Sequence, residues 1–250
     1  MRIFFSTGDN LGGVETNKAT SPHNWPPTWH VSVVAATDST STDLLRRAAA
    51  GAADRSVLTA GYQTAGRGRL DRRWEAPVGV NLLASLLFRD VPAVPHVLTQ
   101  RVALAALAAC ERVANVKATL KWPNDLLRNE MKLAGILAQA EHGAGGDRLV
   151  VVGIGVNVGW APAGAARLGD GIDPLIVLRE MLIAYDELPA DPWLQYRDNV
   201  ATIGRRVRVE LAGGTIEGLA SDVGRDGRLV VVGDDGVQHR YDVADVVHLR

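Results

Sequence analysis

Residues 61–74 read GYQTAGRGRLDRRW, and the rest of the chain is best understood around this stretch. It contains three glycines and four arginines, with Asp71 as its only acidic residue. Glycine allows backbone conformations and close ligand contacts that other residues prevent, and guanidinium groups bind carboxylate or phosphate oxygens through paired hydrogen bonds. This stretch, which we call the arginine loop, is therefore predicted to bind an anion.

Two simpler interpretations are open when the arginine loop is taken alone. Loops rich in Gly and Arg are common as solvated connectors, and arginine-rich segments also contact RNA. Neither accounts for three later segments in which polar residues or glycines interrupt apolar, strand-like runs. These are KWPND at residues 121–125, KLAGIL at 132–137 and GIGVNV at 153–158. Together with the arginine loop, they predict one assembled pocket.

The order and spacing of these four segments resemble those of the biotin protein ligases, or biotin–[acetyl-CoA-carboxylase] ligases. The likeness is strong over residues 31–158 and looser towards the C-terminus. It implies an α+β fold with a mixed β-sheet catalytic domain of the class II synthetase-like or biotin/lipoate ligase type, on which helices pack. It also implies a small C-terminal SH3-like β-barrel.

We expect three parts along the chain. Residues 1–29 include Pro26-Pro27 and predict a flexible N-terminal arm, too short for the DNA-binding helices that some biotin ligases carry. Residues 30–202 are expected to form the catalytic domain. Residues 203–250 are expected to form the C-terminal SH3-like domain, because Gly-Gly and Asp-Gly turns separate short alternating runs, as in a barrel of hairpins.

Apolar periodicity predicts the elements of the catalytic domain. Strands are expected at residues 31–37, 56–63, 80–88, 116–122, 133–141 and 148–158, with residues 124 and 125 in a turn. Helices are expected at residues 44–53, 94–113, 174–188 and 191–200. The sequence contains neither GxGxxG nor GxxxxGK[ST], which argues against a Rossmann or P-loop nucleotide site.

Composition excludes several classes of protein. With 47% hydrophobic and 22% charged residues the chain is typical of a folded globular protein, and its net charge of −1 provides no overall attraction to nucleic acid or anionic membranes. The single cysteine, Cys110, excludes an intrachain disulfide and fits a reducing compartment. The six histidines lack metal-ligand spacing, and no apolar run reaches about 18 residues. We therefore expect no zinc site, no signal peptide, no membrane span and a cytoplasmic location.

The resemblance implies roles for individual residues. The residues implied in binding biotin are Ser39, Thr40, Gln63, Gly66, Arg67, Lys132, Gly135 and Gly155. Those implied in binding ATP or the adenylate are Arg67, Arg69, Arg72, Trp74, Asn124, Lys132, Asn157 and Trp160. Lys132, Arg67 and Arg69 are the implied catalytic residues. The chain departs from the family pattern at Ser41, where asparagine is usual, and at Asp71, where glycine is usual.

Other roles for the same side chains are also open. Ser39 and Thr40 precede a helical pattern and could cap it. Lys132 could extend to solvent, and Trp74 could be a core anchor rather than a lid over the ligand. Asp125 is equally compatible with a turn residue and with a ligand of Mg²⁺ beside a nucleotide.

The implied reaction activates a carboxylic acid. Biotin reacts with ATP to give biotinyl-5′-AMP and pyrophosphate, and a lysine of a biotin carboxyl carrier domain of an acyl-CoA carboxylase then takes the biotin. ATP and Mg²⁺ are the implied cofactors, and the enzyme is expected to be a monomer or homodimer. The nearest alternative is a lipoate or octanoate ligase of the same fold. A nucleic-acid-binding protein is the less favoured alternative, because the chain has near-zero net charge and few aromatic residues.

Overall fold

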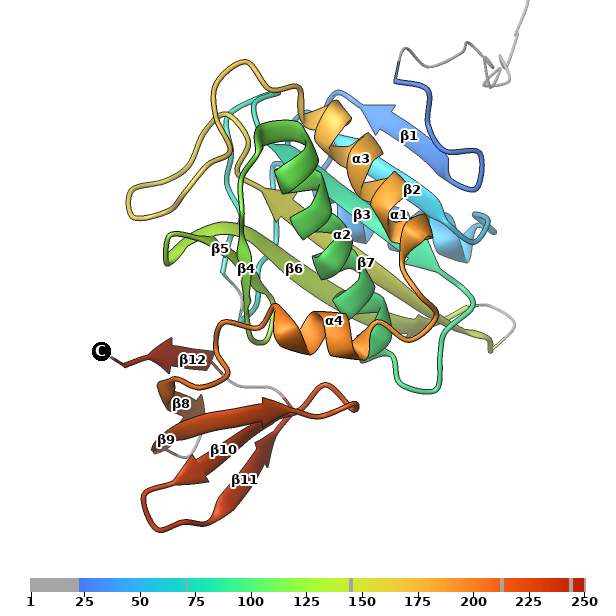
Figure 1. Ribbon diagram of the computed structural model, residues 1–250. Coiled ribbons are helices and arrows are strands. Elements are labelled where there is room, and N and C mark those ends of the chain that lie inside the picture. Colours follow the sequence, from blue (N-terminus) through green and yellow to red (C-terminus); the bar gives the residue numbers. More distant parts are fainter. Residues whose placement is uncertain (1–22, 71, 144–145, 212–213, 243–244, 250) are drawn as a thin grey trace, which may run out of the picture.

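A seven-stranded mixed β-sheet forms the centre of the larger part of the molecule in this computed structural model (Figure 1). The structure describes residues 23–70, 72–143, 146–211, 214–242 and 245–249. In spatial order the strands are β1 (His30–Val34), β2 (Ser56–Ala60), β3 (Leu82–Phe88), β7 (Arg148–Val156), β6 (Met131–His142), β5 (Asp125–Arg128) and β4 (Thr119–Lys121). Strands β1 and β2 are parallel and all other neighbours are antiparallel.

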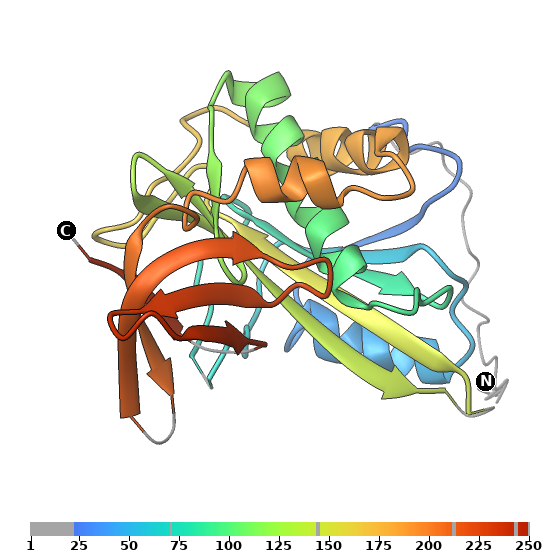
Figure 2. The same ribbon diagram turned by 60° about the horizontal axis from the view of Figure 1, so that its bottom comes forward.

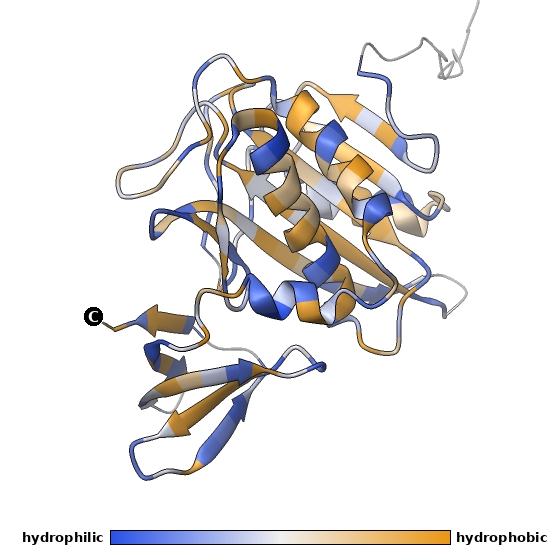
Figure 3. Cartoon of the chain, viewed as in Figure 1, coloured by the Kyte–Doolittle hydropathy of each residue, from blue (hydrophilic) through white to orange (hydrophobic). Residues whose placement is uncertain are grey.

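The middle of this sheet is apolar because its central strands are covered on both faces. All seven residues of β3 are buried, as are most residues of the adjacent β7. These are the near-continuous apolar runs that a strand buried on both faces requires, and the middle of the sheet is coloured mainly as hydrophobic (Figure 3). The sheet is therefore a rigid support for the polar residues at its ends.

Helices cover both faces of the sheet (Figure 2). The helix α1 (Thr40–Ala49) packs Leu44 and Ala48 against Leu58, Leu87 and Val151 on one face. On the other face lie α2 (His96–Ala114), α3 (Pro174–Glu187) and the short α4 (Trp193–Asp198). Within the described ranges, no helix is long and apolar enough to cross a membrane.

The single cysteine lies on the inner side of α2. Cys110 is fully buried and makes no disulfide. Burial disfavours the charged thiolate and raises the pKa of Cys110 to about 12. The thiol therefore acts as a small apolar core group.

The C-terminal part is a second, five-stranded antiparallel sheet. Its strands are β8 (Arg206–Leu211), β9 (Gly214–Val223), β10 (Leu229–Gly233), β11 (Gln238–Tyr241) and β12 (Asp245–His248), in the order β11-β10-β9-β8-β12. Over the residues that are described, β11 and β12 do not pair, so the expected closed barrel is not found. The predicted succession of short hairpin strands is present.

Several predicted element boundaries need correction. The helix α1 begins at Thr40 rather than at residue 44, because Ser39 is its N-cap and accepts a long hydrogen bond of 3.5 Å from Thr42 N. Asp125 does not lie in the turn. It begins the short strand β5, where it pairs with Gly135, and its polar first residue concealed this strand in the sequence.

The end of the predicted flexible arm is packed. Residues 1–22 lie outside the described ranges, but Trp29 is only 4% exposed. Its ring makes edge-on contacts with Phe88 and Tyr185 at centroid distances of 6.1 and 5.2 Å, and its Nε1 donates to Asp186 Oδ2 at 3.1 Å. Contacts with residues more than 50 positions away hold this segment, and the polar local sequence gives no sign of them.

Replacing Trp29 tests whether this segment contributes to the stability of the sheet domain. We expect Trp29→Ala to lower the free energy of unfolding by about 3–5 kcal/mol, because it removes a buried aromatic side chain and its ring contacts. Urea unfolding measures the change. Val33→Ala is the control, since Val33 is 51% exposed on the adjacent strand and should change stability by less than about 0.5 kcal/mol. Equal effects of both substitutions would show that Trp29 is not a core residue.

Candidate active site

The arginine loop and the three later segments line one cavity of about 690 Å³. The predicted site residues found in its lining are Ser39, Thr40, Gln63, Arg67, Arg69, Arg72, Trp74, Asn124, Asp125, Lys132, Gly135, Gly155, Asn157 and Trp160. Gly66 is the exception and lies beside the lining. A Cβ there would be 2.3 Å from Trp74 O and 2.8 Å from Gln63 Nε2, so this position requires glycine for packing.

Basic side chains from two separate segments of the chain line the cavity. Arg67, Arg69 and Arg72 line it from the arginine loop, and Lys132 lines it from the start of β6, more than 50 residues later. The two positively charged segments therefore converge on one space. Lys121, at the end of β4, also lines the cavity and was not among the predicted site residues.

The ammonium of Lys132 lies beside Asp125, Trp74 and Gly135, although the side chain is 40% exposed. Its Nζ lies 2.8 Å from Asp125 Oδ1, an ion pair without the alignment of a hydrogen bond, and 5.6 Å from the centre of the Trp74 ring. A Cβ at Gly135 would lie 3.3 Å from Nζ, which places the ammonium directly over that glycine. Lys132 is therefore partly exposed, with its ammonium held at the cavity by an ion pair.

Two glycines leave a bare patch of backbone on the sheet. Gly135 of β6 and Gly155 of β7 face each other in register, and the indole of Trp74 lies over them. A Cβ at Gly155 would be only 2.4 Å from Trp74 Cε2, so any side chain there would displace the indole. Trp74 Nε1 is buried without a hydrogen-bond partner and can donate to an acceptor that enters the cavity.

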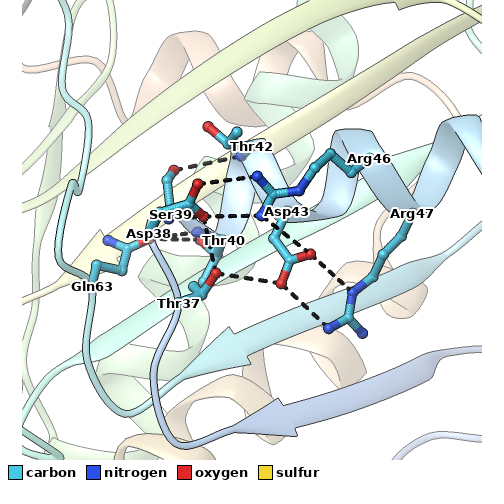
Figure 4. Close-up of polar contacts among 9 residues, drawn as sticks. All are labelled: Thr37, Asp38, Ser39, Thr40, Thr42, Asp43, Arg46, Arg47 and Gln63. Carbon is cyan, nitrogen blue, oxygen red and sulfur yellow. Dashed lines mark hydrogen bonds and ion pairs between the residues drawn. The ribbon is translucent and has the colours of Figure 1, made fainter.

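A polar corner stands at the N-terminus of α1 (Figure 4). Both the backbone N and the Oγ1 of Thr40 donate to Gln63 Oε1, at 2.8 and 3.0 Å. Asp38 accepts from Ser39 N at 2.7 Å and from both terminal nitrogens of Arg46 at 3.1 and 3.2 Å. The Arg46 guanidinium, followed by the Ser39 amide, lowers the pKa of Asp38 to about 2, so Asp38 is ionised at neutral pH and holds the corner in place.

The C-terminal sheet contributes to the wall of the cavity. Asp245, the first residue of β12, forms ion pairs with Arg72 and, at 3.6 Å, with Arg69. Arg69 Nη1 also donates to Asn124 Oδ1 at 3.3 Å. Sequence reasoning missed Asp245, since an acid at the start of a short strand carries no local sign of a partner 173 positions away. Asp71, where the chain departs from the family pattern, lies outside the described residues.

Asn157 and Trp160 anchor the loop that follows β7. Asn157 is 3% exposed, and its Nδ2 donates to Ala166 O at 3.0 Å. Trp160 N donates to Asn81 Oδ1 at 3.1 Å, and its side chain is 36% exposed at the cavity. The Asn157 amide thus holds its own loop, while the Trp160 ring is accessible to a ligand.

The described residues of the cavity provide no cluster of several metal ligands. In the described part of the chain, no group of three or more His, Cys, Asp or Glu side chains is arranged to hold an ion. Asp125, for which the sequence left a turn residue and a ligand of Mg²⁺ equally open, is paired with the ammonium of Lys132, which repels a divalent cation. The structure therefore favours an electrostatic role for Asp125 towards Lys132.

Comparison with known proteins gives a consistent result over both parts of the chain. Residues 33–157 match the Biotin/lipoate A/B protein ligase family, and residues 202–249 match the Biotin protein ligase C terminal domain. The chain is 40% identical over 245 residues to the biotin--[acetyl-CoA-carboxylase] ligase of Mycobacterium tuberculosis, covering 88% of this chain and 89% of the relative. It is 39% identical over 145 residues to the corresponding ligase of Paracoccus denitrificans, covering 55% and 58%.

Solved structures agree on the fold. The biotin protein ligase from Aquifex aeolicus in complex with biotin and ATP superposes with a TM-score of 0.73 at 23% identity, covering 88% of this chain and 99% of that one. The Helicobacter pylori biotin acetyl coenzyme A carboxylase synthetase gives a TM-score of 0.62 at 20% identity, covering 85% and 99%. Sequence and fold lead to the same conclusion: the chain belongs to the biotin protein ligase family.

Proposed function

We propose that this protein is an ATP-dependent biotin ligase that forms biotinyl-5′-AMP and transfers biotin to a lysine of a biotin carboxyl carrier domain. The main observation in support is that Arg67, Arg69, Arg72 and Lys132 all line one cavity. That cavity also contains a hydroxyl-rich corner and a strip of bare backbone. Family membership and the relatives' activities support the same function.

The cationic side chains address the main electrostatic difficulty of the first step. The carboxylate of biotin must approach the α-phosphate of ATP, and both groups are anionic. Two unit charges about 4 Å apart repel by about 4 kcal/mol at an effective dielectric constant near 20. Guanidinium and ammonium groups fixed around the reacting atoms offset this repulsion and stabilise the charge that accumulates in the transition state.

We assign each part of the ligands to a region of the cavity. We place the biotin ring at Ser39, Thr40 and Gln63 and its acyl chain along the backbone at Gly135 and Gly155. Lys132, whose ammonium lies over Gly135, then meets the carboxylate and the α-phosphate together. Because the Trp74 indole covers both glycines, it must shift or share this space when the ligand enters.

The nucleotide is placed on the other side of the cavity. We assign its phosphates to Arg67, Arg69 and Arg72, and its adenosine to the region of Asn124, Asn157 and Trp160. Phosphate oxygens would compete with Asp245 for Arg69 and Arg72, which frees the arginine loop to order over the adenylate. Closure excludes water, which would otherwise hydrolyse the mixed anhydride.

Both steps balance without a further reactant. In the first, a carboxylate oxygen of biotin bonds to the α-phosphorus and pyrophosphate leaves. In the second, the lysine amine of the carrier domain bonds to the acyl carbon, AMP leaves, and the amine loses a proton. The chain's own residues orient the acid, neutralise charge and exclude water.

We propose that Mg²⁺ enters the cavity with ATP, as its counter-ion. We propose that the catalytic and C-terminal domains divide near residue 203 and that the C-terminal domain is SH3-like. We also propose a cytoplasmic location, which the buried free thiol of Cys110 supports, and a monomer or homodimer as the functional unit.

The activity is tested with the pure protein, ATP, Mg²⁺ and different acids. Biotin should support release of pyrophosphate, measured by a coupled phosphate assay, and the further addition of a carrier domain should give a product with the mass of one added biotinyl group. Activity with lipoate or octanoate instead of biotin would assign the protein to the related ligases. If no acid supports release, the enzymatic proposal is wrong.

Lys132→Ala tests the central role of the ammonium. We expect the rate of biotin-dependent pyrophosphate release to fall by roughly 10²–10³-fold, the cost of removing one transition-state contact worth about 3–4 kcal/mol. Lys117→Ala is the matched control, because Lys117 is exposed and does not line the cavity. Circular dichroism should show both variants folded. A Lys132→Ala enzyme with wild-type turnover would exclude Lys132 from the catalytic machinery.

A further inference from the structure

A buried chain of hydroxyl groups lies behind the polar corner of the cavity. Ser85, in the middle of β3, is 0% exposed and does not line the cavity. Its Oγ lies 2.8 Å from Thr40 Oγ1 and 3.0 Å from Ser41 Oγ. Thr40 and Ser41 are themselves only 3% and 6% exposed, yet both line the cavity.

The direction of each hydrogen bond in this chain follows from counting protons. Gln63 Oε1 accepts from the backbone N of Thr40 at 2.8 Å, so this atom is the amide oxygen and not the nitrogen. Thr40 Oγ1 lies 3.0 Å from the same oxygen and must use its only proton there. The proton of Ser85 then points to Thr40, and that of Ser41 points to Ser85.

The fixed directions determine what the cavity offers to a ligand. Thr40 and Ser41 have donated their protons inwards, so towards the cavity they present lone pairs, which accept. The Ser39 hydroxyl and the Gln63 amide nitrogen have no acceptor among the described residues and remain available to donate. A ligand with a carbonyl between two N–H groups, as in a cyclic urea, matches this pattern of donors and acceptors.

The acceptor that Ser85 provides is needed because position 41 is serine in this chain, where the family usually has asparagine. A serine hydroxyl rotates freely, and without a fixed acceptor its proton can point into the cavity. Ser85 supplies that acceptor to Ser41 while it donates to Thr40. Gly153 of β7 leaves the space, since a Cβ there would be 2.6 Å from Ser41 Oγ and 3.4 Å from Ser85 Oγ.

We propose that Ser85 is a positioning residue that sets the hydrogen-bond direction of Ser41, and thereby the recognition of the ureido ring of biotin. This inference rests on the proposed function. Ser85 acts only through Ser41, because its own side chain does not reach the cavity. Its loss removes the acceptor of the buried Ser41 hydroxyl, which is then free to present a donor to the N–H groups of the ligand, while Thr40 still donates to Gln63.

The test is steady-state pyrophosphate release by Ser85→Ala. The KM for biotin should rise about tenfold or more, as for the loss of directed buried hydrogen bonds, while kcat and the KM for ATP change by less than about twofold. The preference for biotin over 2-iminobiotin, in which the ureido oxygen is replaced by nitrogen, should shrink. If Ser85 only stabilised the fold, the substitution would not raise the KM for biotin more than the KM for ATP, and it would not change the preference for biotin over 2-iminobiotin.

Thr59→Val is the matched control. Thr59 is a buried residue of the neighbouring strand β2, its Oγ1 donates to Leu83 O at 3.0 Å, and it does not touch the polar corner. This control should keep the wild-type KM for biotin. Should Ser85→Ala not fold, the nearly isosteric Ser85→Cys takes its place, because a thiol is a poor donor and acceptor.

The outcomes separate the two proposals. Wild-type protein that shows no biotin-dependent release overturns the proposed function, and the inference with it. Active wild-type protein combined with an unchanged biotin KM in the folded Ser85 variant overturns the role of Ser85 alone. An equal rise in KM for biotin and for ATP also overturns it, because that pattern indicates general loosening of the site.

Discussion

The pairing of β6 with β7 places Gly135 opposite Gly155, and the rest of the site depends on this bare stretch of backbone. A side chain at Gly155 would collide with the Trp74 indole, and one at Gly135 would crowd both that indole and the ammonium of Lys132. The register is fixed by long antiparallel strands buried in the core, so the gap between side chains cannot move. Cationic and hydroxyl groups from other segments then lie around this strip of backbone, which the Trp74 indole covers.

The site is assembled across the two sheets rather than within one. Asp245 of the C-terminal sheet pairs with Arg69 and Arg72, and the KWPND segment is held from the same side, since Trp122 Nε1 donates to Gly227 O at 2.9 Å. The backbone N of Trp122 also donates to the buried Thr202 hydroxyl at 3.0 Å, and His248 lies 3.0 Å from that hydroxyl. The C-terminal sheet is therefore a structural part of the active site.

Local patterns in the sequence were sufficient for some features and insufficient for others. The apolar runs predicted the central strands and long helices, and the four motif segments predicted residues that now share a cavity, because each signal lies within a few consecutive residues. Asp245, Ser85 and the burial of Trp29 depend on partners far away in the chain, which no local pattern reports. The start of α1 and the strand β5 were misplaced because polar first residues concealed regular backbone pairing.

The inert thiol of Cys110 has a practical consequence for studying this molecule. Cys110 is the only cysteine of the chain, and its burial suppresses formation of the thiolate. Alkylating reagents therefore have no accessible nucleophilic sulfur to modify at neutral pH. One cysteine introduced on the surface of the arginine loop would thus carry a spectroscopic label without background modification. Such a label would test directly the proposed ordering of that loop over the adenylate, in an otherwise unaltered protein.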